Sequence, residues 1–310
     1  YSYIYIDEIF KYIQSLLNME VPEKKFIDSL NSLILDLKVL KKDDKYYLTS
    51  TYNSEENVAK RIKYLTRIED TKCKSLDKFI YQLEQFNGIT YDDTQKLAMK
   101  KAIEKSFLVV TGGPGSGKTT IIKSIVDLYR DINKLTYEKT LSKVALLAPT
   151  GRASKRISEA TSLPATTIHR FLKWNKELNR FAVNEYNKSD VEFAIIDESS
   201  MVDIFLFDNL LKGLKVDTKI ILVGDYNQLP SVGPGQLLRD VIDSKMVEVV
   251  TLDKVYRQKK GSNIIDFAYQ FNEGIIDEKI FRRNFDLSFV ETRDMLRTSK
   301  EIASEYIDID

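Results

Sequence analysis

One stretch decides the fold of this chain: Gly112-Gly113-Pro114-Gly115-Ser116-Gly117-Lys118-Thr119-Thr120. It follows a short apolar run at 107–110 and precedes an amphipathic run that begins at Ile121. A strand, a glycine-rich turn and a helix in this order are the context in which the pattern G-x-x-x-x-G-K-[ST] cradles phosphates. A turn that merely connects two elements is the alternative, and the flanking strand and helix argue against it. The sequence therefore predicts a nucleotide-binding site.

The residues of this stretch have distinct expected roles. Its glycines let backbone N–H groups turn inward, and the helix N-terminus adds a favourable dipole. Lys118 would neutralise the β- and γ-phosphates, while Thr119 would offer its hydroxyl to Mg²⁺. We therefore assign all of 112–120 to nucleotide binding and expect ATP and Mg²⁺ as cofactors.

Composition describes an ordinary globular protein, with 43% hydrophobic and 30% charged residues among 310. Lys plus Arg number 47 and Asp plus Glu number 46, so any surface that binds nucleic acid must be local. Cys73 is the only cysteine, which excludes a disulfide framework and favours a reducing compartment. No apolar run approaches the ~18 residues of a membrane span. We expect a cytoplasmic protein with no membrane partner.

The first 88 residues predict a small, mainly helical domain. Apolar residues recur at helical spacing over 6–17 and again after Pro22, which we expect at the first position of a helix. Two β-prone runs flank a charged turn within 38–49, and two more helical patterns follow. Two helices and a hairpin wing suggest a winged-helix module. Such a module can read DNA, but basic residues are not concentrated on its second helix, so a structural or interaction role is favoured.

Three further apolar strands, at 143–148, 192–196 and 219–223, end in polar residues. They predict an α/β domain with a parallel sheet, whose ligands gather at the carboxyl ends of the strands. Asp197 follows the second strand and is placed to hold Mg²⁺, and Glu198 to orient an attacking water. Acidic residues in this position, after a phosphate-binding turn, are a strong signal for catalytic carboxylates.

Four other residues are candidates for nucleotide contacts. Gln95 lies one helix before the glycine-rich turn, where its amide could read adenine, although a lone glutamine is normally a solvated helix residue. Gln228 follows the third strand and could sense the γ-phosphate by hydrogen bonding. Tyr256 and Arg257 suit adenine stacking and γ-phosphate neutralisation, a weak signal by itself.

The strand at 143–148 runs into Pro149-Thr150-Gly151-Arg152, which opens a helix. Small and hydroxyl-bearing residues let a nucleic-acid backbone approach, with Arg152 on a phosphate. A plain strand-to-helix turn would look the same at this point.

A small hairpin is predicted at 173–187, with Asn179 in the left-handed turn position and Trp174 at its base. The only histidine, His169, precedes it. A single histidine in a helix is more often a packed residue than a catalyst, and that interpretation is favoured here.

Taken in order, these motifs resemble those of the superfamily 1 helicases, and most closely the RecD-like DNA helicases (the RecD/TraA group, including exodeoxyribonuclease V alpha chains). The motifs that carry the resemblance are Gln95, GGPGSGKTT at 112–120, APTGRASKR at 148–156, TIHRFL at 167–172, DESSM at 197–201, VGDYNQLPSVGPGQLLRD at 223–240 and VYRQ at 255–258.

The resemblance implies an architecture. It implies a RecA-like P-loop NTPase domain at 89–250, preceded by the winged-helix-like domain at 1–88 and followed by the start of a second RecA-like domain at 251–310. It also implies that the hairpin at 173–187 is a strand-separating pin. Single-stranded DNA would contact residues of these motifs, namely Pro149, Thr150, Gly151, Arg152, His169 and Trp174.

The resemblance also implies a function. The protein would translocate 5′ to 3′ on single-stranded DNA and unwind duplex junctions, driven by ATP, in DNA repair or recombination with partner proteins. The family's later motor motifs, including an arginine of the second domain, have no counterpart before Asp310. We therefore expect a fragment that binds ATP but hydrolyses it slowly. A P-loop ATPase that acts as a DNA-dependent switch or clamp is the alternative, while Lys118, Asp197 and Glu198 argue against a non-catalytic module.

Overall fold

A computed structural model describes residues 2–73 and 75–252 and, beyond them, the single positions Phe267, Gln270, Phe271, Gly274 and Asp277. Two compact units divide the chain, Tyr1–Val255 and Tyr256–Asp310. All the helices and strands below belong to the first unit. The predicted second RecA-like domain therefore falls almost wholly outside the described residues, as do Tyr256 and Arg257.

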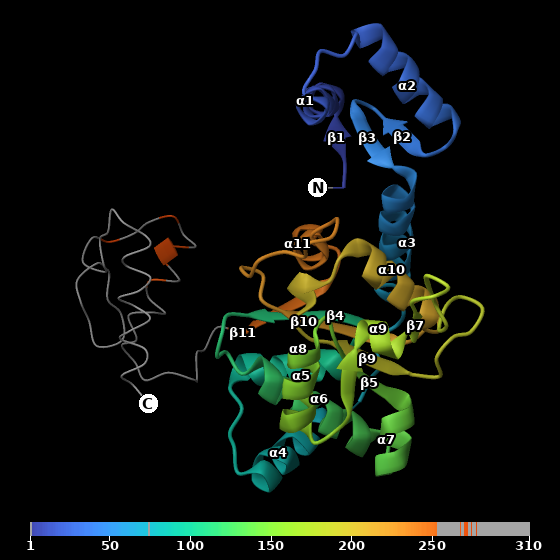
Figure 1. The fold of residues 1–310 in the computed structure, drawn as a ribbon. Helices are drawn as coiled ribbons and strands as arrows, with labels where there is room; N and C mark the ends of the chain where they lie inside the picture. The colour runs from blue at the N-terminus through green and yellow to red at the C-terminus, as the bar shows by residue number, and fades with distance from the viewer. Residues whose placement is uncertain are drawn as a thin grey trace, which may run out of the picture. The chain divides into compact units, whose positions relative to one another are not determined.

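A six-stranded sheet forms the centre of the first unit (Figure 1). Its strand order is β11-β4-β10-β9-β5-β6, and every neighbouring pair is parallel. The strands are β4 (Phe107–Gly112), β5 (Val144–Ala148), β6 (Ala165–Thr167), β9 (Phe193–Ile196), β10 (Lys219–Gly224) and β11 (Glu248–Leu252). The predicted α/β class and parallel sheet are confirmed. The edge strand β6 was not predicted, because three residues are too few to show a period.

Strand residues alternate between two hydrophobic cores. In β4, Phe107 and Val109 pack in one core, whereas Leu108 and Val110 pack in the other. Successive side chains of a strand point to opposite faces, so a strand that is apolar throughout requires helices on both faces of its sheet. The strands are continuously apolar in the sequence because both faces of the sheet are covered.

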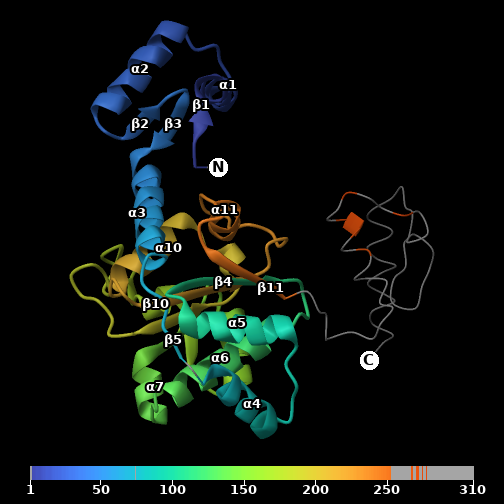
Figure 2. The same ribbon diagram turned by 180° about the vertical axis from the view of Figure 1, so that it is seen from behind.

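Helices cover both faces. Figures 1 and 2 show α5 and α6 side by side below the sheet, and α3, α10 and α11 above it. The core of the first face includes residues of α4 (Leu76–Asn87), α5 (Asp93–Glu104), α6 (Lys118–Ile132) and α8 (Gly151–Thr161). The core of the second face includes residues of α3 (Thr49–Leu65), α9 (Ile168–Phe171), α10 (Ile204–Gly213) and α11 (Leu237–Asp243). The short helix α7 (Tyr137–Lys143) leads into β5. No helix in the described ranges is long and apolar enough to cross a bilayer.

The N-terminal module has a small core of its own. Helices α1 (Ile6–Leu17) and α2 (Glu23–Leu35) pack on a three-stranded antiparallel sheet in the order β1-β3-β2, formed by β1 (Ile4–Tyr5), β2 (Val39–Lys42) and β3 (Lys45–Leu48). This arrangement agrees with the two helices and hairpin wing expected from the sequence. Pro22 lies one position earlier than predicted, as the residue that caps α2.

The hydrophobic cores do not follow the predicted boundary at residue 88. Val58 and Ile62 of α3 and Ile80 and Leu83 of α4 are buried in the two cores that flank the large sheet. The separate N-terminal core ends with β3. The helical periods at 49–65 and 76–87 show which faces are apolar, but they do not show which sheet those faces cover. At the other end, β11 continues two residues past the predicted limit at 250.

Candidate nucleotide site

The predicted phosphate-binding turn connects β4 to α6. Gly115 and Gly117 have φ angles of 79° and 88°, a region in which a side chain would be strained. A Cβ on Gly112 would lie 2.7 Å from Ser116 Oγ and 2.9 Å from the carbonyl oxygen of Leu252. Since the first turn of a helix has N–H groups with no partner inside the helix, the start of α6 adds donors to this turn. Glycine is therefore favoured at positions 112, 115 and 117 of this tight loop, as expected for a phosphate cradle.

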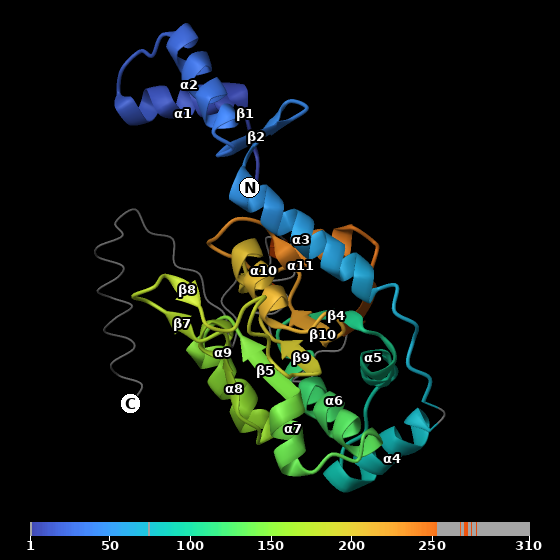
Figure 3. The ribbon, with the colours of Figure 1, turned by 90° about the vertical axis from the view of Figure 1, so that its right-hand side faces the viewer.

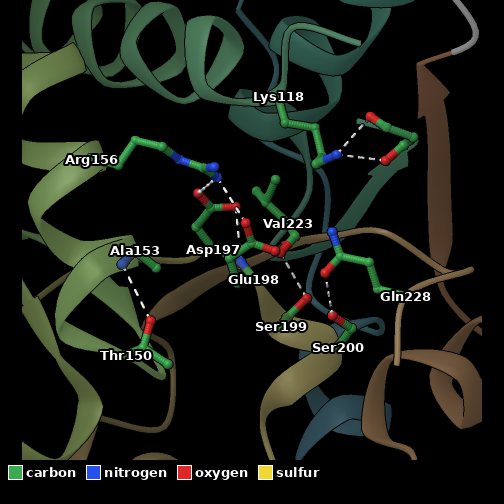
Figure 4. Close-up of polar contacts among 12 residues, drawn as sticks. Lys118, Thr150, Ala153, Arg156, Asp197, Glu198, Ser199, Ser200, Val223 and Gln228 are labelled. Atoms are coloured by element: carbon green, nitrogen blue, oxygen red, sulfur yellow. Dashed lines mark hydrogen bonds and ion pairs between the residues drawn. The ribbon is translucent and has the colours of Figure 1, made fainter. Parts of the chain in front are cut away.

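Lys118 is the first residue of α6 and lies inside the turn (Figure 4). Its Nζ donates to the carbonyl oxygens of Gly112, at 2.6 Å, and Gly113, at 2.9 Å. Burial lowers the pKa of Lys118, while the negative charges of nearby carboxylates, Asp225 first, oppose that shift. The ammonium group is therefore held where it can exchange carbonyl oxygens for phosphate oxygens.

The acidic pair follows β9, as predicted. Asp197 is 1% exposed, and its Oδ1 accepts a hydrogen bond from the Glu198 N–H at 2.9 Å. Burial raises the pKa of Asp197. Glu198 has a φ of 51°, so its backbone turns sharply at the end of the strand. This turn is tied to β10, because the Ser199 hydroxyl donates to the carbonyl oxygen of Val223 at 2.8 Å.

Three oxygens in this region are buried and have no hydrogen-bond partner among the described residues: Ser116 Oγ, Asp197 Oδ2 and Glu198 Oε2. A buried polar group without a partner costs about 1–3 kcal/mol. A bound Mg²⁺–nucleotide would supply such partners, with Thr119 and Asp197 as the predicted metal ligands. No group of three His, Cys, Asp or Glu residues in the described ranges could hold a metal ion by itself. Magnesium would therefore complete its shell with phosphate oxygens and water.

Two charged residues to which the sequence analysis assigned no role also line the site. Arg156, from α8, places its Nη2 2.8 Å from Glu198 Oε1 and 3.8 Å from Asp197 Oδ2 (Figure 4). Asp225, 4% exposed at the end of β10, accepts a hydrogen bond from the Asn227 N–H at 3.0 Å. Both lie in quoted motifs, but Arg156 contacts a segment far away in the chain and the charge of Asp225 acts on Lys118, which spacing alone does not reveal.

Gln228 and Gln95, the two predicted glutamine contacts, are in different situations. Gln228 is exposed, and its Oε1 accepts a hydrogen bond from the Ser200 hydroxyl at 3.4 Å, which places the amide beside the acidic turn (Figure 4). Gln95 is 5% exposed and forms a capping box with Asp92, whose N–H donates to Gln95 Oε1 at 3.2 Å. Gln95 is thus a buried cap rather than a solvated helix residue, and its role with adenine stays a prediction.

The segment predicted to contact DNA begins α8. Thr150 caps the helix by accepting a hydrogen bond from the Ala153 N–H at 3.2 Å. Gly151 and Arg152 are exposed in its first turn, and Pro149 is half-buried before it. The structure therefore leaves the backbone of this turn accessible, as contact with a nucleic-acid strand requires.

The predicted hairpin follows α9 and projects from its end (Figure 3). Strands β7 (Trp174–Asn175) and β8 (Arg180–Phe181) pair antiparallel, and Asn179 takes the expected left-handed conformation at φ 47°. The Phe181 ring lies 4.7 Å from Trp174 and 5.8 Å from His169. His169 is exposed, so the packed position favoured by the sequence was wrong; the four-residue helix α9 buries Ile168 instead.

Known proteins match this chain in sequence and in fold. A family model described as an AAA domain matches residues 95–234. The RecBCD enzyme subunit RecD of Buchnera aphidicola subsp. Schizaphis graminum is 30% identical over 217 residues, which cover 63% of this chain and 34% of that protein. The ATP-dependent RecD2 DNA helicase of Deinococcus radiodurans is 28% identical over 232 residues, 75% of this chain and 30% of that protein.

The fold is shared with the Pif1 helicase from Candida albicans, whose crystal structure matches with a TM-score of 0.50 at 21% identity over 72% of this chain and 55% of that one. The chain spans about a third of the length of the curated relatives named above. The P-loop domain of this chain is thus similar in sequence to RecD-like helicases and shares its fold with a Pif1 helicase.

Proposed function

We propose that this chain is the ATP-binding part of a DNA helicase that couples ATP hydrolysis to movement along single-stranded DNA. One observation carries the proposal: Lys118 and the Asp197–Glu198 pair lie close together at the carboxyl ends of the strands, with buried oxygens that have no hydrogen-bond partner among the described residues. The RecD2 relative is named as an ATP-dependent DNA helicase, which supports the same assignment.

Each residue of the site has a separate proposed role. Mg²⁺ bound to ATP would neutralise charge on the β- and γ-phosphates. Lys118 would release its two backbone carbonyls and bind those phosphates, while Thr119 and Asp197 hold the metal. Glu198 would accept a hydrogen bond from the attacking water and orient it. Gln228 would contact the γ-phosphate from the next loop.

The DNA strand would run over the start of α8 and the aromatic cluster beside it. Arg152 would bind a phosphate, and the Thr150–Gly151 turn would let the backbone approach. Trp174 and His169, whose rings both lie near that of Phe181, would offer aromatic faces on which bases stack. The proposed 5′-to-3′ direction and the pin role of the hairpin rest on family resemblance alone, as do the nucleotide contacts of Tyr256 and Arg257.

The wider setting is also part of the proposal. Several relatives are named as RecD subunits of the RecBCD enzyme, so partner subunits and a role in DNA repair or recombination are expected. The proposed location is the cytoplasm, where the DNA of a bacterial relative lies.

The test is a steady-state ATPase assay with and without saturating oligo-dT, with Lys118→Ala as the inactive control. We expect oligo-dT to raise turnover several-fold, and the increase to fall as salt rises because phosphate contacts carry the binding. A turnover that oligo-dT leaves unchanged, in a protein that still binds Mg²⁺–ATP, would favour a nucleotide switch over a helicase motor.

A further inference from the structure

Arg156 connects the two halves of the proposed mechanism. It lies on α8, whose first turn carries the proposed DNA contacts. Its guanidinium reaches the acidic pair at the end of β9 (Figure 4). One side chain therefore joins the DNA-contacting segment to the carboxylates proposed to hold the metal and the attacking water.

The carboxylate of Glu198 is held by this contact. Its Oε1 accepts a hydrogen bond from Arg156 Nη2 at 2.8 Å, while Oε2 is buried and has no hydrogen-bond partner in the described part of the chain. An oxygen engaged by a guanidinium is a poorer acceptor for a water proton. Glu198 in this arrangement is thus turned toward α8 and restrained.

The guanidinium itself is accessible to a competitor. The Arg156 side chain is 44% exposed, whereas those of Asp197 and Glu198 are 1% and 15% exposed. Arg156 lies four residues after Arg152, so both project from the same side of α8. A guanidinium binds phosphate with the same paired geometry that it uses for carboxylate. A DNA phosphate next to the one on Arg152 would therefore compete with Glu198 for Arg156.

We propose that Arg156 is a positioning residue that restrains Glu198 in the DNA-free protein and transfers to a phosphate when single-stranded DNA binds. The transfer frees Glu198 to orient the attacking water, so that strand binding and ATP hydrolysis are coupled through one side chain. This inference rests on the proposed function, since it requires that DNA runs along α8.

The first experiment measures oligo-dT binding without nucleotide, so it does not depend on hydrolysis. Glu198→Gln weakens the ion pair and should tighten binding about fivefold or more, the usual lower range of coupling between two sites. Arg156→Ala should weaken binding, and the double variant should bind like Arg156→Ala alone. Lys155→Ala is the matched control: it removes another exposed cation of α8, paired with Glu159 at 3.9 Å, and Glu198→Gln should still tighten binding in its presence.

The result that would overturn the proposal is a Glu198→Gln effect of the same size with and without Arg156. Loss of one negative charge near the strand would then explain the change, and no transfer of Arg156 would be needed. Equal affinity in the wild type and Glu198→Gln would overturn it as well.

The second experiment measures ATP turnover. Arg156→Ala should raise the DNA-free rate and reduce the ratio of rates with and without oligo-dT, while KM for ATP stays the same. Arg156→Lys keeps the charge but loses the paired donors. Its DNA-free rate and its stimulation by oligo-dT should lie between those of the wild type and Arg156→Ala. A variant with lower turnover in both conditions, or a raised KM, would show that Arg156 serves the nucleotide instead. A wild type that oligo-dT does not stimulate would contradict the proposed function itself, whereas normal stimulation in Arg156→Ala contradicts only the transfer.

Discussion

Two lysines at opposite ends of the strands of the same sheet are alike in their hydrogen bonds and in the direction of their pKa shifts. Lys118 follows the carboxyl end of β4, and Lys219 begins β10 at the amino end. Each donates to two backbone carbonyl oxygens, Lys219 to those of Ile103 and Lys105 at the end of α5. Burial lowers the pKa of both, that of Lys219 to about 8.

Their surroundings differ. Lys118 lies near three carboxylates and near buried oxygens that have no hydrogen-bond partner in the described part of the chain, which suits the proposed exchange of its turn contacts for phosphate contacts. Lys219 lies at the carbonyl end of a helix, where a cation is favourable, and the negative charges of Asp70 and Glu104 oppose its pKa shift. A buried lysine is therefore a ligand-binding group or a structural one according to what else lies near its ammonium.

The same contrast holds for two buried carboxylates. Asp197 keeps one oxygen without a hydrogen-bond partner in the described ranges. Asp208, 2% exposed in α10, accepts from the Ser54 hydroxyl at 3.0 Å and from Lys212 Nζ at 2.6 Å through Oδ2. Of these two carboxylates, the one with an unsatisfied oxygen lies beside Lys118, and the satisfied one lies in the packing between α3 and α10.

The largest effect is expected from Asp197→Asn, which removes the charge that distinguishes the functional edge. If Asp197 holds the metal as proposed, its loss should lower ATP turnover about 10³-fold, since a metal supplies several kcal/mol of charge stabilisation. The amide can still accept from the Glu198 N–H, so thermal unfolding should not move downward. A normal turnover would show that Asp197 is buried for structural reasons, like Asp208.

Next in size is the paired substitution of the two lysines. Lys118→Ala should weaken Mg²⁺–ATP binding about 100-fold, because hydrogen bonds to charged groups contribute about 1.5–3 kcal/mol each. Lys219→Met should leave that affinity within about twofold, as expected for a site it does not touch. Equilibrium titration of both variants measures the difference, and equal losses would erase the distinction between the two edges.

A smaller effect is expected in the pH dependence of stability, through the ionisation of Lys219. Its pKa is about 8 in the folded protein against an ordinary 10.5, so between these values the unfolded chain binds more protons than the folded one. Stability therefore rises with pH across this window, by about 2 kcal/mol from pH 7 to pH 9.5 for this group. Denaturant unfolding of the wild type and Lys219→Met should show the rise only in the wild type. Parallel pH curves for the two proteins would contradict the lowered pKa of the half-buried Lys219.

The smallest effect is expected at the contact between α3 and α10. Ser54→Ala removes one hydrogen bond to Asp208 and leaves the bond from Lys212, so it should cost about 0.5–1.5 kcal/mol of unfolding free energy. Mg²⁺–ATP affinity should not change. If the loss in Mg²⁺–ATP binding free energy exceeded the loss in unfolding free energy, this contact would also shape the nucleotide site.

The sequence predicts the functional edge better than the structural one, for a physical reason. A phosphate cradle demands glycines, a lysine and a hydroxyl at fixed spacing, so Gly112 to Thr120 and the acidic pair are visible in a linear pattern. Lys219 donates to carbonyl oxygens at the end of a helix. Any nearby cation could do the same, so no sequence spacing predicts that this lysine has the role. Arg156 contacts residues of a separate element, Asp225 acts on Lys118 through its charge, and the helical periods of α3 and α4 do not show which sheet their apolar faces cover. Such contacts depend on strand order, which requires the folded structure.

The most direct test of the account is a crystal structure of the protein with Mg²⁺ and a non-hydrolysable ATP analogue. We predict that Lys118 Nζ leaves the Gly112 and Gly113 carbonyls for phosphate oxygens, and that Asp197 faces the metal. Lys219 should keep both of its carbonyl contacts. A nucleotide bound elsewhere, or a Lys118 that stays on its carbonyls with the analogue in place, would contradict the assignment of this edge as the ATP site.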